Sequence, residues 1–127
     1  AAWIGEAGVG AVIDGRALRL LKTIPLGEGM RPMGTAMAPD GTRLYISTGR
    51  SRMVLVLDTA TDEVVASIDV GPRPWGIAVS SDGRTLFTAN GPSNDVSVVD
   101  LATRQVTKKI PVGEGPWGLA FVERPPL

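Results

Sequence analysis

The chain repeats itself every 42 residues, and this period restricts its possible folds more than any other feature of the sequence. The tripeptide Pro74-Trp75-Gly76 returns as Pro116-Trp117-Gly118, and Pro32-Met33-Gly34 stands 42 positions upstream of the first copy. Asp58 recurs as Asp100 with the same spacing. A fixed period of this length is typical of arrays in which each unit is one supersecondary element that buries its apolar face against the next unit.

Each unit contains four short segments with the character of β-strands. In the second full unit these are residues 76–80, 85–89, 96–100 and 105–112. The first two are joined by Ser81-Asp82-Gly83-Arg84, a hairpin turn in which Gly supplies a positive φ and Asp bonds the nearby backbone. Four strands per repeat, with no helical periodicity, predict an all-β fold of β-propeller blades, each a sheet of four antiparallel strands.

The unit resembles the YVTN repeat family of β-propellers, which reads approximately P-x-G-V-A-V-S-P-D-G-x-x-L-Y-V-A-N-x-x-S-N-x-V-S-V-I-D-x-A-T-x-x-V-V-A-x-I-P-V-G. Residues 74–113 match nearly every position, and residues 32–71 match with a different loop, Gly49-Arg50-Ser51-Arg52. The resemblance covers residues 12–122 and implies propeller architecture. Such repeats occur in exported or surface proteins of bacteria and archaea with many roles, so it implies a periplasmic, secreted or cell-surface location and no single activity.

Lettering the strands of a blade A to D from the axis outward gives the order BCD-ABCD-ABCD-A within one domain, residues 1–127. Residues 1–26 form a partial BCD blade, residues 32–70 and 74–112 form full blades, and residues 118–122 are a lone A strand that closes the ring. Asp14 precedes Asp58 by 44 positions, and the two extra residues indicate a longer loop after the first blade.

Three blades do not close a ring, because propellers are built from about four to eight. Two explanations stay open. Either the chain is the C-terminal part of a longer propeller, or identical chains assemble so that the A strand of one copy completes the BCD sheet of the next. In both cases residues 118–122 pair with a strand like the one around Trp3 and Ile4, and the partner is either the remaining blades or a second copy.

Composition excludes several classes of function. Thirteen basic and thirteen acidic residues leave no net charge, so we expect no nucleic-acid partner. Cysteine and histidine are both absent, which removes the usual nucleophile, base and metal ligands. We therefore expect a chain that is not an enzyme and has no cofactor and no metal site. No apolar run approaches the ~18 residues of a membrane span, so we also expect no membrane insertion.

Recurring aspartates are expected to stabilise turns. Asp58 and Asp100 end strand C before a turn, and Asp40 and Asp82 lie in hairpin turns. A carboxylate at such a position can accept backbone N–H groups across the bend. Catalytic carboxylates repeated in every blade would be unusual.

The candidate binding residues lie in the D-to-A and B-to-C connections, which emerge on one face of a propeller. The candidate ligand-binding residues are Trp75, Trp117, Arg73, Arg31, Met33, Arg50 and Asn90, and the same loops hold Arg52, Asn94, Glu6 and Glu114. Tryptophan and arginine are enriched in binding hot spots, and a guanidinium can stack on an aromatic face. The alternative is that both tryptophans pack over the end of the central channel and that Arg50 and Arg52 are only solvated.

Three hypotheses for function follow. The leading one is a non-enzymatic binding or scaffolding propeller that holds a protein or small molecule on this loop face. The second is a part of an enzyme or redox complex, of the quinoprotein-associated type, whose catalytic groups lie outside the chain. The third is a structural protein of the cell surface, such as a surface layer.

Overall fold

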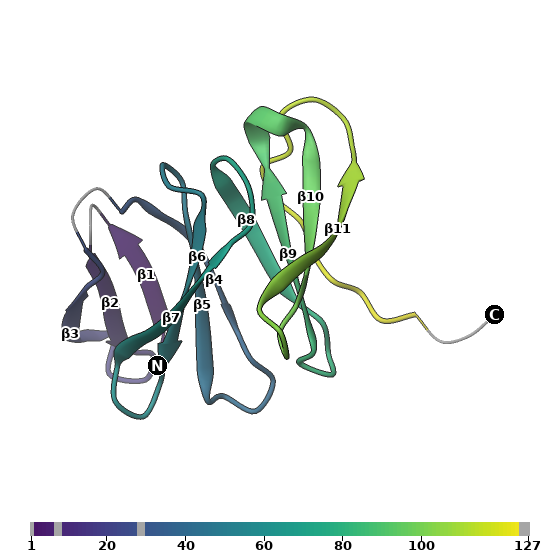
Figure 1. The fold of residues 1–127 in the computed structure, drawn as a ribbon. Coiled ribbons are helices and arrows are strands. Elements are labelled where there is room, and N and C mark those ends of the chain that lie inside the picture. The colour runs from purple at the N-terminus through teal and green to yellow at the C-terminus, as the bar shows by residue number, and fades with distance from the viewer. Residues whose placement is uncertain (1, 7–8, 28–29, 125–127) are drawn as a thin grey trace.

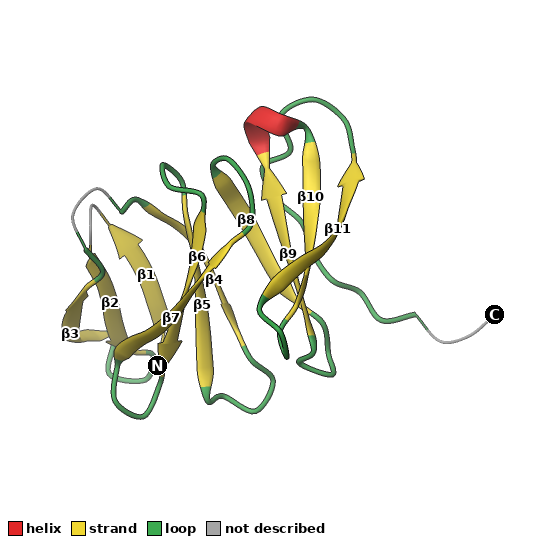
Figure 2. Cartoon of the chain, in the orientation of Figure 1, coloured by secondary structure: helices red, strands yellow, loops and turns green. Residues whose placement is uncertain are grey.

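The computed structural model of the protein describes residues 2–6, 9–27 and 30–124, which form three antiparallel sheets side by side (Figure 1 and Figure 2). Blade 1 contains β1 (Ala2–Glu6), β2 (Val9–Asp14) and β3 (Arg19–Pro25). Blade 2 contains β4 (Pro32–Met37), β5 (Arg43–Thr48), β6 (Met53–Asp58) and β7 (Glu63–Asp69). Blade 3 contains β8 (Pro74–Val79), β9 (Thr85–Asn90), β10 (Asp95–Asp100) and β11 (Gln105–Pro111), with the short 3₁₀ helix η1 (Gly91–Ser93) between β9 and β10.

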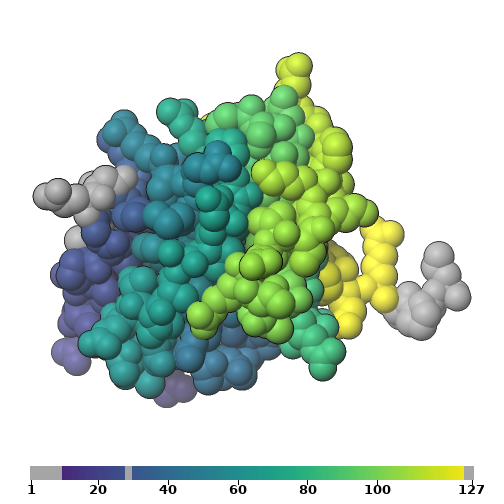
Figure 3. Space-filling model, in the orientation of Figure 1, coloured from purple at the N-terminus to yellow at the C-terminus, as the bar shows by residue number. Residues whose placement is uncertain are grey.

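Within each blade the strands pair in chain order, as expected of a propeller blade. Blade 1 has three strands and blades 2 and 3 have four each. This confirms the all-β fold and the order BCD, ABCD, ABCD expected from the 42-residue period. The three parts of the chain follow one another across the molecule in chain order (Figure 3), and buried apolar side chains join blade 1 to blade 2 and blade 2 to blade 3.

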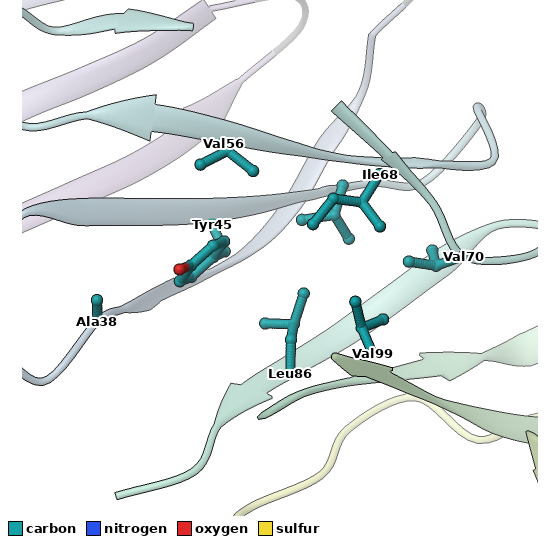
Figure 4. Close-up of a cluster of buried hydrophobic side chains, with 8 residues drawn as sticks. Ala38, Tyr45, Val56, Ile68, Val70, Leu86 and Val99 are labelled. Carbon is teal, nitrogen blue, oxygen red and sulfur yellow. The ribbon is translucent and has the colours of Figure 1, made fainter. Parts of the chain in front are cut away.

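Blade 2 is apolar on both faces, because alternate side chains of a strand point to opposite sides of the sheet. The set that packs with blade 1 consists of Leu44, Ile46, Leu55 and Leu57. The set that packs with blade 3 includes Tyr45, Val54, Val56 and Ile68, which meet Leu86 and Val99 (Figure 4). Strands buried on both faces are expected to be almost continuously apolar, as Met53–Leu57 is.

The recurring aspartates stabilise turns, as predicted. Asp58 Oδ1 accepts the N–H of Ala60 at 2.8 Å, and Asp100 Oδ1 accepts that of Ala102 at 2.9 Å. In the hairpin turns, Asp40 Oδ1 accepts the N–H of Thr42 and Asp82 Oδ1 that of Arg84. These carboxylates are occupied with backbone donors at the ends of strands.

Residues 118–122, expected as a lone A strand, have no regular secondary structure in the single chain. A β-strand is defined by hydrogen bonds to a partner, and the B strand foreseen as that partner, β1, lies at the opposite end of the blade row (Figure 1). The segment nevertheless contacts blade 3. Phe121 stacks on Phe87 with ring centroids 5.9 Å apart, and Ser81 Oγ donates to Glu123 Oε2 at 2.9 Å. Pairing of this segment with another sheet stays a prediction.

Candidate functional site

The D-to-A and B-to-C connections gather on one side of the blade row, the upper side in Figure 1. We call this side the loop face; its described residues are 26–27, 30–31, 49–52, 70–73, 91–94 and 112–117. The opposite side carries the A-to-B and C-to-D turns. The predicted binding residues therefore lie at one end of every sheet.

Four of the predicted residues surround a single hollow on the loop face. Arg31, Met33, Arg50 and Arg73, together with Gly49, line a space of about 220 Å³. They come from three separate connections, since Arg31 follows blade 1, Arg50 joins two strands of blade 2, and Arg73 precedes blade 3. All four side chains are exposed. Folding therefore brings together residues that the sequence only placed on a common face.

Local backbone geometry fixes the hollow. The N–H of Gly49 donates to the carbonyl of Arg31 at 2.6 Å, which ties the B-to-C loop of blade 2 to the preceding D-to-A loop. A Cβ on Gly49 would lie 2.5 Å from Cγ of Met33, so only glycine lets the Met33 side chain lie across this loop. Arg73 has φ +47°, a left-handed conformation that is uncommon for any residue but glycine.

The rim of the hollow is cationic. Within the described part of the chain, the ion pairs of arginine are Arg43 with Asp58 and Arg52 with Asp69. Neither pair involves the three arginines of the hollow. A guanidinium offers several N–H donors in a planar fork, which suits carboxylate and phosphate oxygens. The hollow thus has the charge and the donors to bind an acidic group.

The two predicted tryptophans contact each other and do not line this hollow. The rings of Trp75 and Trp117 meet edge to face, with centroids 5.3 Å apart and planes at 70°. A Cβ on Gly91 would collide with the Trp75 ring, so that ring lies flat on the loop that follows β9. Trp117 leaves 72% of its surface exposed. Trp75 therefore packs against the protein, whereas Trp117 presents an exposed aromatic surface.

Asn90 differs from the other predicted site residues because its side chain is fully buried. Its amide nitrogen donates to Asp95 Oδ1 and to Ser97 Oγ, each at 2.8 Å, and its Oδ1 accepts from Thr88 Oγ1 at 3.2 Å. Every polar atom of the side chain is thereby used within blade 3. Asn90 fixes the start of the loop on which the Trp75 ring packs, and its side-chain polar atoms are all bonded within the protein.

Comparison with known proteins supports the fold. No protein-family model matches the chain, and no curated protein is significantly similar to it. Among solved structures, hydrazine synthase from Kuenenia stuttgartiensis is 37% identical with a TM-score of 0.68, over 70% of this chain and 25% of that one. Dihydro-heme d1 dehydrogenase NirN in complex with DHE is 23% identical, also with a TM-score of 0.68, over 88% of this chain and 24% of that one. The chain folds as blades of a β-propeller. It spans about a quarter of each of these two structures.

The described residues include no helix long and apolar enough to span a membrane. They also include no group of three or more acidic side chains placed to hold a metal ion.

A second and larger hollow lies on the opposite side, between blades 2 and 3, and sequence reasoning missed it. It measures about 580 Å³, and its lining includes Tyr45, Arg43, Arg84, Asp100 and Arg104. The signal that could have revealed it is a departure from the repeat, since Arg84 and Arg104 stand where the preceding unit has Thr42 and Asp62.

Proposed function

We propose that the chain is a binding and scaffolding part of a β-propeller, without catalytic activity of its own, that holds a protein or small molecule on its loop face. The observation that carries this proposal is the convergence of Arg31, Met33, Arg50 and Arg73 around one hollow. On the same face, Trp117 adds an exposed aromatic surface. Apolar and aromatic surface next to a few polar donors is the usual composition of a ligand site. The proposed location is periplasmic, secreted or at the cell surface.

Three turn aspartates of the chain are unsuited to proton transfer. Backbone N–H groups of Ala17 and Thr42 lower the pKa of Asp14 and Asp40, and the Ser80 hydroxyl does the same for the pKa of Asp82. A carboxylate with a lowered pKa is a weaker base and stays ionised at neutral pH, which suits a turn and not proton transfer. Without histidine or cysteine the sequence offers few other groups for acid–base or nucleophilic chemistry.

The partner that completes the ring would cover the outer face of blade 3. Phe87, Val98 and Ile110 stand on this face at the positions where blade 2 presents Tyr45, Val56 and Ile68 to its neighbour, and Ile110 is 38% exposed. Further blades of the same polypeptide or of a second copy would bury this surface in the same way. Arrays of this kind gain stability from each interface between neighbouring units.

The test uses thermal shift assays of the full chain with a panel of small ligands that are anionic, cationic, neutral polar and apolar. A binding loop face gives at least one ligand that raises the melting temperature, since a ligand that binds only the folded state stabilises it. The shift should disappear in Arg50→Ala and Met33→Ala and persist in the control Arg19→Ala, at an exposed position on β3. A panel without any shift, or a shift that both loop-face variants retain, contradicts the proposal.

A second candidate function is membership of a redox complex whose catalytic groups lie outside this chain. The observation that favours it is the 37% identity with hydrazine synthase. Purification of the chain from its native source should then yield a stable complex whose other components carry visible cofactor absorbance. Recovery of the chain free of any coloured component would exclude this candidate.

A further inference from the structure

Blades 2 and 3 differ in the side chain that covers the B-to-C loop. Met33 of blade 2 stands 42 positions before Trp75 of blade 3, and Gly49 stands 42 positions before Gly91. A Cβ on Gly91 would collide with the Trp75 ring, and a Cβ on Gly49 would lie 2.5 Å from Cγ of Met33. Met33 therefore covers its loop as the indole of Trp75 covers the next one. Because a thioether chain fills less space than an indole, room for the hollow of about 220 Å³ remains beside Met33.

Each arginine of this hollow comes from a different connection. Arg31 and Arg73 stand 42 positions apart, immediately before the proline that begins strand A, and the next copy of this position is Gly115. Arg50 stands where blade 3 has Pro92. Three connections thus each bring one guanidinium group to the same space.

The backbone at position 73 favours glycine, yet the residue is arginine. Arg73 has φ +47°, and Gly115 at the equivalent position has φ +59°. Glycine adopts this left-handed conformation readily, whereas it is uncommon for residues with a side chain. Residues held in such conformations are concentrated at ligand sites. The strain at Arg73 therefore indicates that its guanidinium has a role in binding.

The charge of the hollow is not compensated within the described part of the chain. No acidic side chain is among the residues that line it. Asp69, which ends β7, pairs with Arg52, and none of the described ion pairs includes Arg31, Arg50 or Arg73. All three arginines are exposed, so an anion can reach them from solvent.

Size and donor number indicate the kind of anion. A space of about 220 Å³ is smaller than the roughly 300 to 1,000 Å³ of sites that enclose a whole small molecule, so it suits a single anionic group. A carboxylate offers two oxygens and one charge, whereas a phosphate monoester offers three terminal oxygens and nearly two charges at neutral pH. Three guanidinium groups from three connections therefore match a phosphate group better than a carboxylate.

We propose that the hollow binds a terminal phosphate group, either inorganic phosphate or the monoester of a small molecule. The phosphate oxygens accept hydrogen bonds from Arg31, Arg50 and Arg73, and the exposed Met33 offers an apolar contact to the body of a monoester. This inference rests on the binding role proposed above for the loop face and names the class of its ligand.

The test is isothermal titration calorimetry of the full chain with phenyl phosphate, inorganic phosphate and phenyl sulfate, in phosphate-free buffer of low ionic strength at about pH 7.5. Phenyl sulfate has the shape of phenyl phosphate but a single charge, whereas the second pKa of a phosphate monoester is about 6. We expect phenyl phosphate to bind with a Kd of about 1 mM or lower, and phenyl sulfate to bind about fivefold more weakly or worse.

Inorganic phosphate that binds at least as tightly as phenyl phosphate identifies the phosphate group alone as the ligand, and tighter binding of phenyl phosphate identifies a monoester. Absence of binding by both phosphates, or equal affinity for phenyl phosphate and phenyl sulfate, would overturn the proposal.

Two variants introduce residues that the chain already contains at equivalent positions. Arg73→Gly copies Gly115 and should weaken phenyl phosphate binding about fivefold or more, while glycine suits the left-handed backbone there. Met33→Trp copies Trp75, fills the hollow and should weaken binding several-fold. Circular dichroism checks that each variant is folded.

Arg84→Thr is the control, because it removes an exposed arginine on the opposite side of the blade row and copies Thr42 of the preceding unit. It should leave phenyl phosphate affinity unchanged. Full affinity in folded Arg73→Gly, or an equal loss in Arg84→Thr, would overturn the assignment to this hollow. If phenyl phosphate does not bind while another ligand of the thermal shift panel acts through Arg50 and Met33, the phosphate assignment is wrong and the binding role of the loop face stands.

Discussion

Gly76 and Trp117 meet backbone to backbone: a Cβ on Gly76 would lie 2.5 Å from the carbonyl oxygen of Trp117. The relationship repeats one unit earlier, where a Cβ on Gly34 would lie 3.1 Å from the carbonyl oxygen of Trp75. Trp75 belongs to β8, the innermost strand of blade 3. Trp117 therefore occupies the place that the innermost strand of a fourth blade would take, although residues 118–122 are not paired as a strand.

Gly76→Ala should destabilise the chain by about 1–3 kcal/mol, the usual cost of forcing extra volume into a filled space. The added methyl would meet the Trp117 carbonyl and the Cα of Gly118, which are backbone atoms with little freedom to move. Urea unfolding followed by tryptophan fluorescence measures the change. Gly113→Ala is the matched control, because nothing lies within 4 Å of the place its methyl group would take and its backbone is not left-handed. Equal stability of the two variants would contradict the close contact.

Removal of residues 118–127 should convert a discrete assembly into aggregate or unfolded chain. The deletion strips Phe121 from the stack on Phe87 and leaves the apolar face of blade 3 more exposed. It also removes the strand that we expect to pair with another sheet, and unpaired edges promote aggregation. Light scattering measures the size distribution. A truncated chain that stays a soluble, cooperatively folding monomer would refute the predicted ring closure.

Leu57→Ala should cost about 2–5 kcal/mol of unfolding free energy, as is usual for a leucine removed from a closed core. Leu57 is fully buried between blades 1 and 2. Leu18→Ala is a suitable control because Leu18 is 82% exposed, and surface changes of this kind stay within about 0.5 kcal/mol. Chemical denaturation of both variants gives the comparison. A Leu57→Ala loss as small as that of the control would mean that the blades do not pack as described.

Acid should weaken the fold through the turn aspartates. The Thr42 backbone N–H lowers the pKa of Asp40, and the Ser80 hydroxyl lowers that of Asp82, from an ordinary value of 3.8. A carboxyl whose pKa is lower in the folded state contributes stability above its unfolded value, and this contribution is lost as pH falls through the folded value. Stability should therefore decline below about pH 4.

The double variant Asp40→Asn/Asp82→Asn should show a smaller difference between its urea midpoints at pH 7 and pH 3 than the parent chain. Glu63→Gln, at an exposed strand position, should keep the full difference. If the double variant keeps the full difference between its two midpoints, these two turns do not cause the acid dependence.

The fold could be predicted from the sequence because its determinants recur at fixed spacing. Asp58 and Asp100 mark the end of the same strand in two blades, and their turns are alike in the structure. The fate of residues 118–122 could not be predicted in the same way, because an A strand needs a neighbour that this stretch of sequence does not specify. The loop-face residues were placed on the correct side by strand order alone, whereas the burial of Asn90 depends on Asp95 and Ser97 of the next strand.

The larger hollow between blades 2 and 3 could not be predicted from the sequence for another reason. Ala66 and Arg104 are ordinary as single residues, and they gain meaning only beside Lys22 and Asp62, which stand at the equivalent positions of the preceding junction. Only the contact of Lys22 with Asp62 in the structure shows that the equivalent positions face each other across a junction. Pairwise comparison of repeat units could have flagged the substitutions but not their meeting in space.

Because blade 2 is apolar on both faces, it should resist local unfolding more than blades 1 and 3 do. Within the described residues, blade 2 is the sheet enclosed on both sides, while blades 1 and 3 each pack on one. Its amide protons should be the last to exchange with solvent, and opening should spread inward from the flanking blades, as in a one-dimensional row of coupled units. Each added blade would then protect the one before it, so that rigidity in such a row is a property of position and not of the local sequence.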